Sequence, residues 1–166
     1  TISSSTASAA FTSGIDSTYD AYKFVLSGVR PVTDDVDFHL LFSVDGGSSY
    51  LGGSCRYAVT SRDSGGNVED ANSDGASFML LTGDDVGNES DESFNAEIVL
   101  YDPSNAAFHK NVSFQGSYFD HGSLPNFLLG AGSNTGSVAA VTGIKFQFAS
   151  GNILEGSFTM YGMAKA

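Results

Sequence analysis

The sequence is short of basic residues, and this shortage argues against several kinds of partner. Seven Lys and Arg stand against nineteen Asp and Glu, which gives a formal net charge of −12. Proteins bind nucleic acids by neutralising phosphates with basic side chains, so this balance argues against a nucleic-acid partner. It disfavours anionic membrane surfaces for the same reason. No apolar run reaches the length of a membrane-spanning helix, so we expect no membrane insertion.

Cysteine and tryptophan are almost absent. The single cysteine, Cys55, excludes an intramolecular disulfide, and there is no Trp to form a large aromatic platform. Cys55 opens an alternating segment in which Tyr57 and Val59 share its face, so we expect it to be packed rather than reactive. A chain of 166 residues can bury a sufficient core without disulfides.

Short alternating or apolar segments, separated by Gly, Ser, Asp and Asn, fill the chain from end to end. This pattern predicts an all-β protein, an antiparallel β-sandwich of jelly-roll type with about ten strands, no substantial helix and a single domain over residues 1–166. The expected strands cover residues 7–12, 22–29, 37–44, 55–61, 78–82, 94–101, 111–118, 127–130, 141–149 and 156–163. We interpret the polar stretches 61–77 and 83–93 as long loops, and Gly151-Asn152 as a hairpin turn.

A calcium site is the first candidate for chemistry. Residues 70–75 read DANSDG, which matches the start of a calcium loop in which alternate oxygen-bearing side chains converge on the ion. The metal ligands would be Asp70, Asn72 and Asp74. The bidentate Glu expected at the twelfth position is Leu81, so a simple polar turn is the competing interpretation.

A binding patch is the second candidate. Tyr118, Asp120 and His121 place an aromatic ring, a carboxylate and an imidazole close together in the sequence, as a sugar-binding or protein-binding surface would. A strand-end turn explains the same residues without a ligand. The sequence has no nucleophile elbow, no zinc-protease motif and no phosphate-binding loop, so we expect a protein that is not an enzyme.

Four segments together carry a resemblance to a known family. They are GIDSTYDAYKFVLSGVRP (14–31), DDVDF (34–38) with FSVDGGSSY (42–50), IKFQFASGNI (144–153) and GSFTMYGM (156–163). They resemble a β-rich structural module of tailed-bacteriophage virion proteins, including those of marine and cyanobacterial phages. With the middle strand 96–103, the resemblance covers about two-thirds of the chain and leaves out the stretches 61–77 and 83–93.

The resemblance implies a structural protein on the surface of the phage particle. Its members occur in tail fibres, receptor-binding appendages and head-surface proteins, so both a tail location and capsid decoration are expected alternatives. It also implies other virion proteins as partners, homo-oligomers (most often trimers), and host attachment with a host surface glycan as a further partner. It assigns no catalytic residue. A carbohydrate-binding β-sandwich module is the alternative function, with Tyr50, Tyr57 or Tyr118 in place of Trp.

Overall fold

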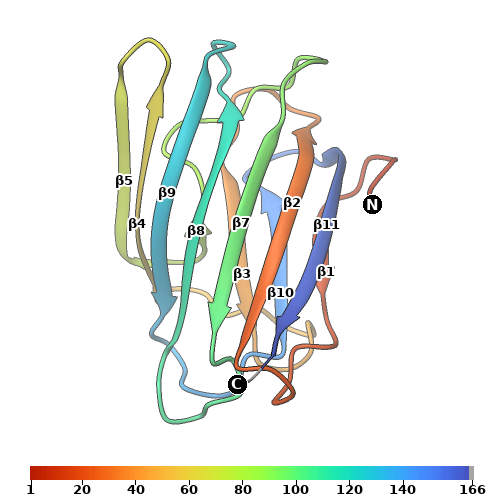
Figure 1. Ribbon diagram of the computed structural model, residues 1–166, viewed down its shortest axis with the longest axis vertical. Helices are drawn as coiled ribbons and strands as arrows, with labels where there is room; N and C mark the ends of the chain where they lie inside the picture. Colours follow the sequence, from red (N-terminus) through yellow and green to blue (C-terminus); the bar gives the residue numbers. More distant parts are fainter. Residues whose placement is uncertain (165–166) are drawn as a thin grey trace.

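The protein is a sandwich of two antiparallel sheets, as the computed structural model of residues 1–164 shows (Figure 1). The small sheet has the order β1 (Ala9–Phe11), β10 (Gly143–Phe148), β3 (Phe38–Ser43), β6 (Met79–Leu80). The large sheet has the order β11 (Ile153–Met163), β2 (Ala21–Pro31), β7 (Phe94–Tyr101), β8 (Lys110–Phe119), β9 (Pro125–Asn134), β4 (Cys55–Asp63), β5 (Val68–Ala76). The predicted all-β sandwich is therefore confirmed, and the described residues contain no helix.

The core lies between the sheets because alternate side chains of each strand face inward. In the first half of β2 the buried residues are Tyr22, Phe24 and Leu26, and the residues between them are less buried and lie on the outer face. Aromatic rings join the two layers: the Phe38 ring of the small sheet lies 4.9 Å, between centroids, from the Phe94 ring of the large one. Cys55 is fully buried, as expected for a packed cysteine, and burial raises the pKa of its thiol.

One of the two predicted loops is wrong. Residues 61–77 are mostly β-strand: β4 continues to Asp63 and, after a tight turn, β5 runs antiparallel to it. β5 is the edge strand of the large sheet (Figure 1), and most of its residues are exposed. An edge strand with little to bury needs no apolar alternation, which is why its sequence looks like a loop. The stretch 83–93 is irregular, as predicted, apart from isolated bridges at Val86.

The turn at Gly151-Asn152 also differs from its prediction. It does not make a hairpin, because β10 belongs to the small sheet and β11 to the large one. Gly151 adopts a positive φ of 70°, and the Asn152 carbonyl accepts a hydrogen bond from the Val32 amide at 2.8 Å. The connection therefore carries the chain across the sandwich and positions β11 beside β2. No helix in residues 1–164 could cross a membrane.

Candidate binding face on the large sheet

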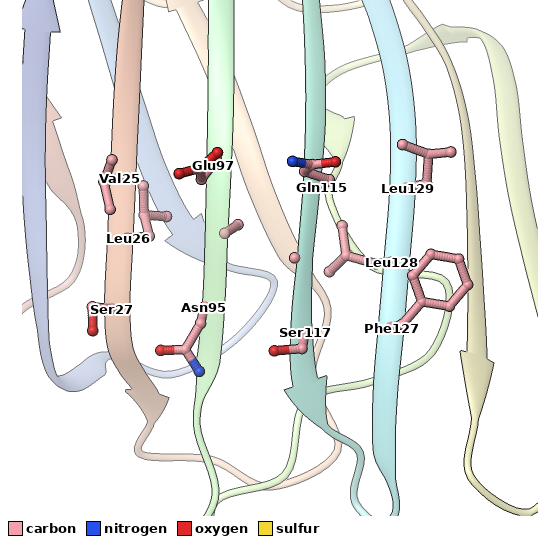
Figure 2. Close-up of a pocket in the computed structure, with 12 residues that line it drawn as sticks. Val25, Leu26, Ser27, Asn95, Glu97, Gln115, Ser117, Phe127, Leu128 and Leu129 are labelled. Atoms are coloured by element: carbon pink, nitrogen blue, oxygen red, sulfur yellow. The ribbon is translucent and has the colours of Figure 1, made fainter.

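The outer face of the large sheet is made of rows of side chains that run across its strands. Since neighbouring strands pair in register, residues that are far apart in the sequence stand side by side. Figure 2 shows two such rows over β2, β7, β8 and β9. The first row contains Val25, Glu97, Gln115 and Leu129, and the second contains Asn95, Ser117 and Phe127, with Ser27 beside it.

A hollow of about 540 Å³ lies among these rows. Its floor is the backbone of Ala96 and Gly116, which stand opposite each other on β7 and β8. A side chain on Gly116 would collide with the Asn95 carbonyl, so glycine is what allows β7 and β8 to approach closely here. The apolar wall is formed by Phe127 and Leu129, which remain 54% and 51% exposed.

The polar wall of the hollow contains both engaged and free groups. Glu97 forms an ion pair with Lys23 of β2, with 2.7 Å between Oε1 and Nζ. The Asn95 amide accepts a hydrogen bond from the Gly28 N–H and donates one to Ser93 Oγ. The side chains of Gln115 and Ser117 form no hydrogen bond within residues 1–164. Their donors and acceptors are therefore available to a ligand.

The same face continues as further depressions toward β5. One of about 320 Å³ lies beyond Leu129 and is lined by Thr60, Asp70 and Asn72. Another lies over Arg56, Tyr101, Asn111 and Ser133, near the other end of the strands. The outer face of the large sheet is thus hollowed at several places along one continuous surface.

The predicted calcium ligands lie at the margin of this face. Asp70, Asn72 and Asp74 are alternate residues of β5, so their side chains share the outer face at successive positions along an extended strand. Asp74 Oδ1 lies 2.7 Å from Nε of Arg56. The loop on which the calcium hypothesis depended is absent. Within residues 1–164, no group of three or more His, Cys, Asp or Glu side chains is placed to hold a metal ion.

Tyr118, Asp120 and His121 do not share one surface. Tyr118 is buried, and its hydroxyl accepts a hydrogen bond from the Asp84 amide and donates one to Ser61 Oγ. Asp120 is also buried, and it accepts hydrogen bonds from the Gly122 and Leu124 amides and from Asn126 Nδ2. His121 alone is exposed, with Nδ1 3.1 Å from Oδ1 of Asp35. Tyr118 and Asp120 therefore hold the end of β8 in place.

The other tyrosines proposed as sugar platforms are also engaged. Tyr50 stacks under the Lys145 ammonium, 4.2 Å from the ring centroid, and Tyr57 packs against the core. An exposed aromatic residue beside the hollow is Phe127, a residue for which the sequence predicts a strand and no binding role. Alternation could not reveal it, because Leu128, between Phe127 and Leu129, is apolar as well and takes the buried side.

A separate acidic cluster lies beside the start of the loop 83–93. Burial is the main cause that raises the pKa of Asp85, to about 6, and the charges of Asp37, Asp35 and Asp84 add to it. Burial raises the pKa of Asp37 as well. The cluster therefore holds a proton more tightly than isolated carboxylates do.

Comparison with known proteins assigns no role to any residue of these sites. No protein-family model matches the chain, and searches of curated proteins and of solved structures found no match.

Proposed function

We propose that this protein is a non-enzymatic structural protein displayed on the surface of a bacteriophage particle, as a tail fibre or receptor-binding module or as a capsid decoration protein. The observation that carries the proposal is how the segments of the resemblance are arranged in the folded chain. The separate sequence segments that resemble the phage module pack against one another and form one continuous part of the sandwich (Figure 1).

In this part of the sandwich, strands from the N-terminal half of the chain pair with strands from its C-terminal end. β2 pairs with β11 over most of its length, and β3 pairs with β10. The IDSTYD turn also contacts the final strand, because the Tyr19 ring covers Gly162 so closely that any side chain there would collide with it. The Tyr22 hydroxyl of β2 holds the turn from the other side, since it donates to Asp16 Oδ1 and accepts from the Asp16 amide. The motifs therefore complement each other as parts of one module.

The hollow on the large sheet supports binding rather than hydrolysis. Glycoside hydrolysis uses two carboxyl groups that face each other across the bond to be cut. Among residues 1–164, one acidic residue, Glu97, lines the hollow, and it is paired with Lys23. The face offers contact groups without a pair of opposed acids.

Immunogold electron microscopy of purified particles of the encoding phage tests the proposal. We expect a specific antibody to label intact particles, and labelling confined to other fractions of the lysate would contradict the proposal. Copy number from quantitative mass spectrometry separates the two locations, since a capsid decoration is present in far more copies than a tail appendage. We further propose a trimer, which light scattering would report as three times the 17.3 kDa of one chain.

A further inference from the structure

We propose that the hollow between β2, β7, β8 and β9 binds a neutral carbohydrate, with the Phe127 ring as its apolar platform and Gln115 and Ser117 as hydrogen-bonding groups. The identification of this glycan with a host surface rests on the proposed function. The existence of the site rests on the geometry of the outer face alone.

The size and shape of the hollow suit a small ligand. Its volume of about 540 Å³ lies within the range of about 300–1,000 Å³ that small-molecule sites occupy. The strands that form it are paired with their neighbours on the sheet, and a pre-formed site loses little free energy to ordering when a ligand binds.

Its hydrogen-bonding groups suit hydroxyls. Gln115 offers an amide N–H donor and a carbonyl acceptor, and the Ser27 and Ser117 hydroxyls offer both functions. In the free protein these groups hydrogen-bond to water. They favour binding only of a ligand that replaces those hydrogen bonds. A sugar, which presents neighbouring hydroxyls that both donate and accept, can satisfy this wall, whereas an apolar ligand cannot.

The apolar wall suits the other side of a sugar ring. A pyranose presents a face of C–H groups, and the face of an aromatic ring carries negative charge density that attracts polarised C–H groups. Phe127 is 54% exposed and stands beside Leu129 at the edge of the hollow (Figure 2). A ligand that is apolar on one face and rich in hydroxyls at its edge matches both walls.

The charge of the site selects against anions. Glu97 contributes a carboxylate, and the adjacent Lys23 is already paired with it. The net charge of −12 adds a long-range repulsion of anionic ligands. The glycan that suits this site is therefore neutral rather than sulfated, phosphorylated or sialylated.

The test is an NMR titration of the full-length ¹⁵N-labelled chain with five neutral tetrasaccharides: cellotetraose, maltotetraose, laminaritetraose, chitotetraose and mannotetraose. We expect at least one of them, at millimolar concentration, to shift amides of β7, β8 and β9 in a saturable way. Phe127→Ala should weaken this binding roughly tenfold or more, and Gln115→Ala should weaken it severalfold. Phe108→Ala is the matched control, because Phe108 is 68% exposed in the loop between β7 and β8 and lies outside the hollow.

Four results would overturn the proposal. The first is that none of the five probes shifts an amide of the outer face, and the second is that Phe108→Ala weakens binding as much as Phe127→Ala does. The third is that 3′-sialyllactose binds as tightly as the best neutral probe. The fourth is that Phe127→Ala and Leu129→Ala dissociate an oligomer, which would mean that a second copy of the chain occupies the face. Each of these outcomes is independent of the particle-labelling experiment, so failure of the glycan site is distinguishable from failure of the proposed function.

Discussion

At the scale of single residues, Tyr118 shows how a polar group can hold distant segments together. Its hydroxyl lies 3.0 Å from Ser61 Oγ on β4 and 2.9 Å from the Asp84 amide in the loop 83–93. Burial is the main cause that raises the pKa of its phenol to about 12, so the group stays neutral and keeps its donor. Tyr118→Phe removes one partner from each of these two groups.

We expect Tyr118→Phe to lower the free energy of unfolding by about 1–3 kcal/mol, the cost of leaving buried polar groups unpaired. Urea unfolding followed by circular dichroism would measure it. Tyr101→Phe serves as the control, because the Tyr101 hydroxyl bonds only to Ser113 on the exposed face and its loss should change stability by less than about 0.5 kcal/mol. Equal losses in the two variants would contradict the structural role assigned to Tyr118.

Asp85 gives a pH-dependent prediction at the same scale. Its pKa is raised from 3.8 to about 6, so the folded state holds the proton more tightly than the unfolded chain does. The stability linked to Asp85 is therefore fully present below the unfolded pKa, and it is lost as the pH rises through about 6.

Asp85→Asn should therefore stabilise the protein above pH 7, because an amide removes the like-charge repulsion and still donates a hydrogen bond. Allowing for solvent screening, we expect a gain of about 1 kcal/mol at pH 8, seen as a Tm about 2–4 °C higher. At pH 4.5 the wild-type carboxyl is already protonated, and the two melting curves should converge. Asp91→Asn, at an exposed position of the same loop, is the control for a general loss of charge. A gain of the same size at both pH values would refute the account.

At the scale of elements, the contact between the N-terminal turn and β11 can be tested by a double-mutant cycle. The Tyr19 ring occupies the space above Gly162, and it also packs edge-on against Tyr22 at 5.7 Å between centroids. Gly162→Ala must displace the ring, so we expect a loss of about 1–3 kcal/mol, the usual cost of overpacking. In Tyr19→Ala the obstacle is gone, and adding Gly162→Ala should then cost little. Additive losses would show that the two residues do not interact.

The strands that could be predicted from the sequence are those that bury one face, because burial of one face requires apolar residues at alternate positions. Strands such as 94–101 were placed correctly because Phe94, Ala96, Ile98 and Leu100 alternate with exposed residues over a covered core. β5 was missed because it is an edge strand with almost nothing to bury. The candidate site was not predicted, because Phe127 of β9 comes beside Gln115 and Ser117 of β8 only through the pairing of the two strands. No local pattern in the sequence predicts which residues of two strands pair.

At the scale of the whole molecule, the excess of acidic residues should make stability depend on salt. Three ion pairs join Lys or Arg to carboxylates within residues 1–164, and seven basic residues cannot pair one-to-one with nineteen acidic ones. Their mutual repulsion opposes the compact state. Raising NaCl from about 10 mM to about 150 mM shortens the screening length from about 30 Å to about 8 Å, so the Tm should rise by a few degrees.

The same melting experiment decides the calcium hypothesis for Asp70, Asn72 and Asp74. Successive side chains on one face of an extended strand are about 6.5 Å apart, and a calcium ion needs its oxygen ligands within about 2.3–2.6 Å. Three residues along β5 therefore cannot all reach one ion, and Asp74 is already paired with Arg56. We expect CaCl₂ and MgCl₂ at equal ionic strength to raise the Tm equally, because both act by screening. A calcium-specific rise that Asp70→Asn or Asp74→Asn abolishes would show instead that the edge strand leaves the sheet to form the metal loop.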